Sequence, residues 1–275
     1  MASSPSEVIS MTAVAFWLFI GAEFAIPISG QVKNAKKNVP LGMALGLIVI
    51  LIMQAIMVLG FYHYTPWDEL ANSAAPHMLY GELLLGKAGK IWMAFVAALA
   101  VISTQNSGVN GLAYIGQGIA KTNKRGVPYI GVILISVSMF IFAYISDGSS
   151  DMIEFLILVG SVFWMITYIF AHIDVLILRK KLPRAPRSFK VPCGPLFPLI
   201  GIIGTSYMIF YISTDPHERL MIWLITGVTL IVLGIYAFFW TKYKMKMPVF
   251  KAVPIEKVMA MDNEMYYKLR KKRGI

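Results

Sequence analysis

The stretch that decides the fold runs from Phe16 to Pro40 and reads FWLFIGAEFAIPISGQVKNAKKNVP. It begins in an apolar run and ends in a basic loop, but its middle holds three residues that a membrane helix normally avoids. Gly21 has no side chain to pack, Glu23 is ionisable, and Pro27 lacks the N–H that continues a helix. Because irregular backbone at membrane depth persists only beside protein or a water-filled cavity, we expect a broken helix facing such a cavity.

The composition is that of an integral membrane protein. The chain has 275 residues, of which 57% are hydrophobic, and its mean hydropathy is +0.68. The single cysteine excludes an internal disulfide and a multi-cysteine metal site. No zinc-ligand spacing, phosphate-binding loop or nucleophile triad is present in the sequence, so we expect no enzyme activity, no metal and no cofactor. A transmembrane helix needs about 20 apolar residues, and seven segments qualify: 9–30, 41–64, 88–118, 128–146, 153–178, 196–213 and 219–241.

The positive charges are distributed according to a membrane topology. All but three of the 25 Lys and Arg residues follow the first, third, fifth or seventh segment, and the exceptions are Lys87, Lys90 and Arg219. The positive-inside rule then predicts an outside N-terminus and a cytoplasmic C-terminus in the plasma (cell inner) membrane. The net charge of +11 is therefore interpreted as topology and not as nucleic-acid binding. We expect a transmembrane domain over 1–241 and a basic cytoplasmic tail over 242–275 that contacts the bilayer.

Several motifs carry a resemblance to a known family. FIGAE at 19–23 and VKNAKKNVP at 32–40 resemble the sixth transmembrane helix, with its following loop, of the amino acid–polyamine–organocation (APC) superfamily of amino acid permeases. Ala35 stands where that family has a proline. Three later stretches resemble the eighth family helix, the loop before the ninth and the loop after the tenth. They are AVISTQNS at 100–107, NKRGVP at 123–128 and RKKLPRAPRSFKVP at 179–192.

The resemblance implies the second part of a permease, from helix six to helix twelve. The expected fold is all-α and polytopic, with about seven transmembrane helices that form the second part of a 5+5 inverted-repeat transporter with a broken first helix. The expected function is amino acid transport, coupled to a proton or to a counter-substrate. The family's five earlier helices and its R-D-G-x-x-P segment have no counterpart in the sequence. A truncated or split permease is therefore expected, and a second chain supplying those five helices is a candidate partner.

Two other functions stay open at this point. A non-transporting membrane subunit or remnant fits the missing repeat. A seven-helix receptor fits the predicted topology, but the last segment, 219–241, has no internal lysine for a retinal Schiff base.

Glu23 is the candidate coupling residue. A carboxylate at the bilayer centre costs at least ~2.5 kcal/mol on insertion scales, so function is its default explanation. The function would be proton binding or gating. The alternative is a structural cap on N–H groups that the broken helix leaves free.

The remaining candidates would contact the substrate. Trp17 matches a family tryptophan that stacks on substrate, although lipid-facing bulk is an equal alternative. By resemblance, the free N–H groups of Gly21 and Ala22 would hold the substrate carboxylate. Further candidates for substrate contact are Phe19, Ile20, Ser103, Asn106 and Ser161, although interhelical hydrogen bonding is the commoner use of Ser and Asn in membranes.

Overall fold

All the regular elements that the computed structural model describes are helices. It describes residues 4–26, 29, 32–71, 73, 75–115, 129–147, 149–183, 193–244, 246–250 and 254. The α-helices are α1 (Pro5–Phe16), α2 (Ala35–Tyr64), α3 (Trp67–Ala71), α4 (Pro76–Ile115), α5 (Tyr129–Ser146), α6 (Ser150–Lys181), α7 (Leu196–Phe210) and α8 (Pro216–Phe239). Two 3₁₀ turns, η1 (Trp17–Phe19) and η2 (Ala22–Ala25), follow α1, and a π-helical turn, η5 (Trp240–Lys244), follows α8.

The predicted polytopic membrane fold is confirmed. Among the described residues, six helical stretches are long and apolar enough to cross a membrane. They coincide with six of the seven predicted segments. The remaining predicted segment, 196–213, corresponds to α7, a shorter apolar helix of 15 residues. The protein is therefore an integral membrane protein.

The chain divides into two compact units, Met1–Ile222 and Trp223–Ile275, with the boundary inside α8. The division predicted at residue 241, between a membrane domain and a basic tail, stays a prediction. Most of that tail lies outside the described residues.

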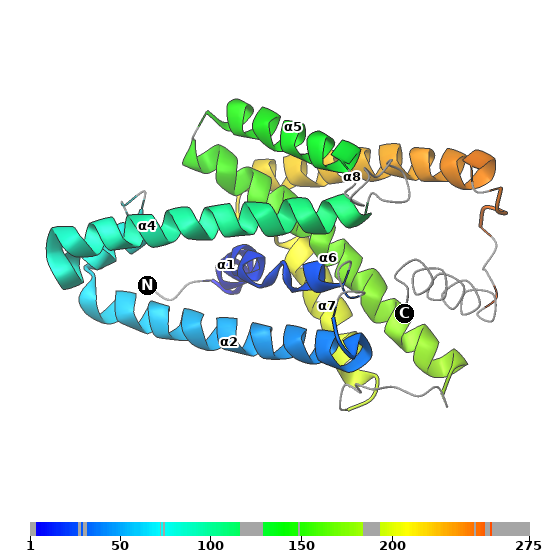
Figure 1. Ribbon diagram of the computed structural model, residues 1–275, viewed down its shortest axis with the longest axis horizontal. Helices are drawn as coiled ribbons and strands as arrows, with labels where there is room; N and C mark the ends of the chain where they lie inside the picture. Colours follow the sequence, from blue (N-terminus) through cyan, green and yellow to red (C-terminus); the bar gives the residue numbers. More distant parts are fainter. Residues whose placement is uncertain are drawn as a thin grey trace. The chain divides into compact units, whose positions relative to one another are not determined.

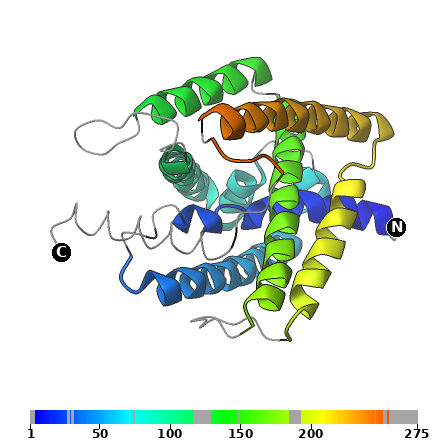
Figure 2. The same cartoon turned by 90° about the vertical axis from the view of Figure 1, so that its right-hand side faces the viewer.

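The core of the first unit forms where α1 packs against α6 and α7 (Figures 1 and 2). Ala13 on α1 is fully buried there, because its small side chain lets the helices approach closely. The Ser10 hydroxyl donates to the Ile212 carbonyl at 3.5 Å, which ties α1 to the end of α7. The buried core residues are Ala13, Leu158, Val159, Val162, Met165, Ile212 and Ile222.

The first helix begins earlier than its apolar run. Ser4 accepts a hydrogen bond from the Glu7 N–H at 3.3 Å, and the Glu7 carboxylate accepts one from the Ser4 N–H at 2.8 Å. This capping box satisfies two N–H groups at the helix start. The helix therefore starts at Pro5, four residues before the predicted segment at residue 9.

The third membrane helix, α4, contains a sharp corner. Leu85 (φ −132°, ψ 15°) and Gly86 (φ 61°, ψ −150°) leave the helical conformation inside it. The backbones of Gly81 and Gly89 meet so closely across the corner that a methyl group on Gly89 would overlap the Gly81 carbonyl. The helix therefore extends on the N-terminal side of the predicted segment, which begins at residue 88, and changes direction just before it.

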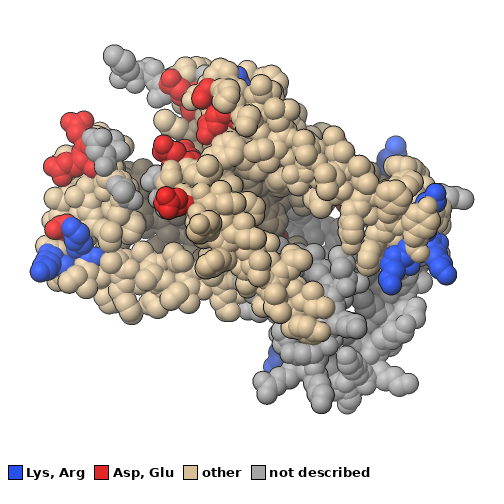
Figure 3. Space-filling model, turned by 90° about the horizontal axis from the view of Figure 1, so that it is seen from above, with Lys and Arg blue, Asp and Glu red and all other residues tan. Residues whose placement is uncertain are grey.

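Most of the large apolar side chains face outward. No residue of α2 is buried. In Figure 3 the charged side chains form separate groups, and broad stretches of the visible surface carry none. This is the pattern of a surface in contact with lipid, because lipid tails and apolar side chains are equivalent environments.

Candidate substrate site

The predicted break in the first membrane helix is present at Ile20 and Gly21. The α-helical hydrogen bonding ends at Phe16, and Ile20 is extended (φ −76°, ψ 139°). Gly21 has φ 120° and ψ −18°, a conformation that L side chains rarely adopt, which explains why glycine occupies this position. The chain then resumes as η2. Pro27, the other predicted cause of the break, lies outside the described residues.

Glu23 turns back toward the break. Its Oε2 atom accepts a hydrogen bond from the Gly21 N–H at 3.1 Å. Its Oε1 atom is buried and has no hydrogen-bond partner among the described residues. One carboxylate oxygen therefore caps the broken helix, while the other makes no hydrogen bond to a described residue, and the Tyr168 hydroxyl is the polar group that interacts with this carboxylate. A buried carboxylate oxygen without a hydrogen bond is costly, so this position would favour a ligand that brings a hydrogen-bond donor.

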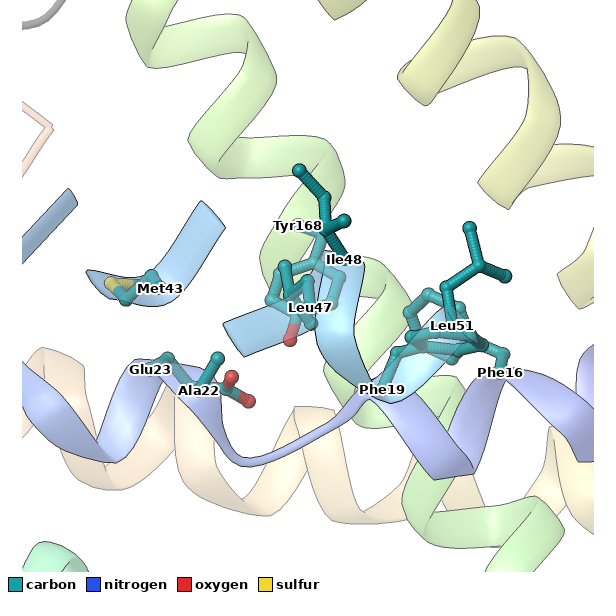
Figure 4. Close-up of a pocket in the computed structure, with 9 residues that line it drawn as sticks. All are labelled: Phe16, Phe19, Ala22, Glu23, Met43, Leu47, Ile48, Leu51 and Tyr168. Atoms are coloured by element: carbon teal, nitrogen blue, oxygen red, sulfur yellow. The ribbon is translucent and has the colours of Figure 1, made fainter. Parts of the chain in front are cut away.

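A cavity of about 570 Å³ lies beside the break (Figure 4). This volume falls within the range of small-molecule pockets. Its wall is apolar apart from the Glu23 carboxylate and the Tyr168 hydroxyl, which lie close enough to interact electrostatically. In Figure 4 the Tyr168 ring reaches from α6 toward the Glu23 side chain. The lining residues are Phe16, Phe19, Ala22, Glu23, Met43, Leu47, Ile48, Leu51 and Tyr168.

Aromatic rings of α6 hold both sides of the break. The Tyr168 ring meets Phe16 edge to face, with centroids 5.6 Å apart, before the break. The Trp164 ring meets Phe24 in the same way at 5.9 Å after it. Trp164 and Tyr168 are one helical turn apart on α6, and the centroids of their rings are 6.2 Å apart. Edge-to-face pairs of this kind add stability beyond their buried area, so α6 fixes the unwound segment from one side.

The structure places the predicted substrate residues in different surroundings. Phe19, Ala22 and Glu23 line the cavity, and Ile20 and Gly21 form the break. The Trp17 ring lies over Gly160 of α6, where an added Cβ would come within 3.2 Å of it, and Trp17 does not line the cavity.

The more distant candidates lie away from the cavity wall. Ser161 is fully buried on α6, and its hydroxyl has no hydrogen-bond partner among the described residues. Ser103 and Asn106 are exposed on α4. None of the three lines the cavity. Their roles in substrate contact stay predictions.

Besides Phe16 at the end of α1, two further sets of lining residues were not predicted from the sequence. Tyr168 could have been found from its spacing, because it lies four residues after Trp164 and therefore on the same helix face. The other set, Met43, Leu47, Ile48 and Leu51 on α2, carries no chemical signal in the sequence. Within the described residues, no group of three or more His, Cys, Asp or Glu side chains could hold a metal ion.

Comparisons with known proteins agree with one another. The putative arginine/ornithine antiporter of Bacillus subtilis is 27% identical over 246 residues, which cover 83% of this chain and 50% of that protein. The branched-chain amino acid permease BcaP of the same organism is 22% identical over 81% of this chain and 49% of its own length. The putrescine transporter PotE of Escherichia coli is 27% identical over 90% of this chain and 56% of its own length. No solved structure matches the chain.

The chain thus spans about half the length of the curated relatives it matches. The sequence profile described as amino acid permease matches residues 2–242, which include the broken helix, the cavity and the core. The chain therefore belongs to the amino acid permease family.

Proposed function

We propose that this chain carries the coupling half of an amino acid transporter in the plasma membrane. The observation that supports it most is the Glu23 carboxylate, which lies on a broken helix beside an apolar cavity and has one buried oxygen that makes no hydrogen bond to the described part of the chain. Broken membrane helices are where secondary transporters build substrate and coupling-ion sites. The relatives, which are named as an antiporter, a permease and a transporter, support the same function.

The Gly21 N–H group would link proton binding at Glu23 to substrate binding. By resemblance this group would hold the substrate carboxylate, yet in this structure it donates to Glu23 Oε2. Glu23 and a substrate carboxylate would therefore compete for one donor. A neutral carboxyl is a weaker acceptor than a carboxylate, so protonation of Glu23 would release the N–H for substrate. Proton binding and substrate binding would then favour each other, as linkage requires.

The Glu23→Gln variant tests this coupling. The test uses a transporter completed with the five N-terminal helices of a relative. In the unmodified transporter, substrate affinity is expected to rise as pH falls, because protonation weakens Glu23 as an acceptor for the Gly21 N–H. Glu23→Gln keeps the size but does not titrate, so it should still bind substrate and lose most of the pH dependence of uptake. Uptake of labelled amino acid into proteoliposomes across a pH series measures this.

Glu154→Gln is the matched control, because Glu154 is an exposed glutamate on α6 outside the cavity. It should keep the pH profile of the unmodified transporter. A Glu23→Gln variant with an unchanged pH profile would leave the carboxylate as a cap on the broken helix and would rule out the coupling role.

The orientation and the partner belong to the same proposal. The charge distribution supports an outside N-terminus and a cytoplasmic C-terminus. A five-helix chain or segment would supply the first half of the transporter. Reporter fusions at Asn72 and Lys124 should read outside and inside, respectively, and the same side for both would contradict the topology.

A further inference from the structure

The end of α8 and the π-helical turn after it gather several aromatic rings. Tyr236 and Trp240 lie one turn apart with ring centroids 5.9 Å from each other. Phe239 and Tyr243 stack at 5.9 Å with their planes only 12° apart. The membrane-length stretch ends at Lys244, so these rings lie within its last nine residues. Aromatic side chains at the end of a span mark the membrane–water interface.

A lysine ammonium lies over two rings at this level. The Lys242 Nζ atom is 5.7 Å from the centroid of Phe238 and 5.4 Å from that of Tyr243. Both distances are within the range of a cation–π contact. Lys244 and Lys246 follow within four residues, and the sequence has no Asp or Glu between Glu218 and Glu256. The rings therefore hold a positive charge that no acidic neighbour in the sequence balances.

The backbone after the helix folds back toward the end of α8. The π-helical turn η5 closes α8, and the Met247 N–H donates to the Thr241 carbonyl at 3.1 Å. Single π-helical turns are rare and occur often at functional sites. Phe250, with φ 64°, comes back to within 6.2 Å of the Phe238 ring, yet its side chain is 96% exposed. A phenyl ring this exposed is unfavourable in water but favourable among lipid chains at the interface.

We propose that this surface, formed by Phe238, Lys242, Tyr243, Lys244 and Phe250, binds the headgroup of an anionic phospholipid. The rings fix the Lys242 ammonium at the depth of the lipid phosphates, and its three N–H donors suit phosphate oxygens. Lys244 adds positive charge, which favours an anionic over a zwitterionic headgroup. Phe250 enters the acyl region beside the bound lipid. The inference does not depend on the transport proposal.

Tryptophan quenching by brominated lipids tests the proposal. The full chain is reconstituted in phosphatidylcholine vesicles that carry a small fraction of brominated phosphatidylglycerol or, in parallel, of brominated phosphatidylcholine. Subtracting the signal of a Trp240→Phe variant isolates the quenching at Trp240. Brominated phosphatidylglycerol is expected to quench Trp240 more strongly. Lys242→Gln should lower this preference about fivefold, as expected for one lysine at an anionic surface.

Two variants separate the site from general charge effects. Lys242→Arg keeps the charge and the ring contacts, so it should keep the preference. Lys180→Gln removes an exposed lysine at the end of α6 and should also keep it. Equal quenching by the two lipids in the unmodified chain would overturn the proposal, as would an equal loss in Lys180→Gln and Lys242→Gln. Loss of the preference in inorganic phosphate, but not in chloride of the same ionic strength, would indicate a free-anion site and would also overturn it.

Discussion

Two long apolar helices of this protein, α2 and α6, have opposite structural roles. α2 is the more apolar of the two, yet none of its residues is buried. α6 is less apolar and supplies four of the buried apolar residues of the core, among them Val162 and Met165. In water the more apolar helix would be the core helix. In a membrane, lipid solvates apolar side chains as well as protein does, so hydropathy predicts insertion but not packing.

Small and aromatic residues account for the difference in burial between α6 and α2. On α6, Gly160 leaves room for the Trp17 ring, and Tyr168 and Trp164 reach across to Phe16 and Phe24. On α2, the glycines at 42 and 46 have open space beside them. The comparison therefore predicts that equal substitutions on the two helices have unequal costs.

The largest contrast is expected between two methionines. Met165 on α6 is fully buried, and Met53 on α2 is 57% exposed. Met165→Ala should leave a cavity in the protein core and cost about 2–3 kcal/mol of unfolding free energy. Met53→Ala faces lipid, which can fill the space, and should cost less than about 0.5 kcal/mol. Thermal unfolding of the purified chain in one detergent compares the two. Equal losses would show that α6 is not the core helix.

A smaller contrast is expected on α7, which packs against α6. A Cβ added at Gly201 would overlap the imidazole of His172 on α6, whereas Gly204 has open space beside it. Gly201→Ala should cost about 1–2 kcal/mol relative to Gly204→Ala, because the imidazole must move within a packed interface. The same unfolding measurement applies. His172→Ala should abolish the difference between the two glycine variants, and its persistence would contradict the contact.

The smallest effect should have the opposite sign. Ser161 on α6 is buried with its hydroxyl unpaired among the described residues. Ser161→Ala should therefore be neutral or stabilising by up to about 1 kcal/mol, because it removes a desolvated polar atom. Ser138→Ala on α5 is the control, since that hydroxyl is exposed and donates to the Leu134 carbonyl at 2.9 Å. A clear destabilisation by Ser161→Ala would indicate a hydrogen-bond partner for this hydroxyl and would support a polar role for it.

Several features of the fold followed from local sequence. Gly21 predicted the break, because the backbone conformation found there is free of strain only for a residue without a side chain. The apolar segments predicted the membrane helices, because an uninterrupted run of about 20 apolar residues has few other stable locations. The start at Pro5 was missed, although Ser4 and Glu7 carry the spacing of a capping box.

The membrane class, the family, the position of the break and the carboxylate beside it all follow from the amino-acid sequence alone. These are local properties, set by solvation and by the conformational limits of single residues. Only the tertiary structure decided which groups face that carboxylate. It placed Tyr168 and the α2 side chains at the cavity, laid Trp17 on Gly160, and gave the Gly21 N–H to Glu23. These contacts depend on how helices distant in the chain pack, and apolarity carries no such information in lipid because every apolar face is equally well solvated there.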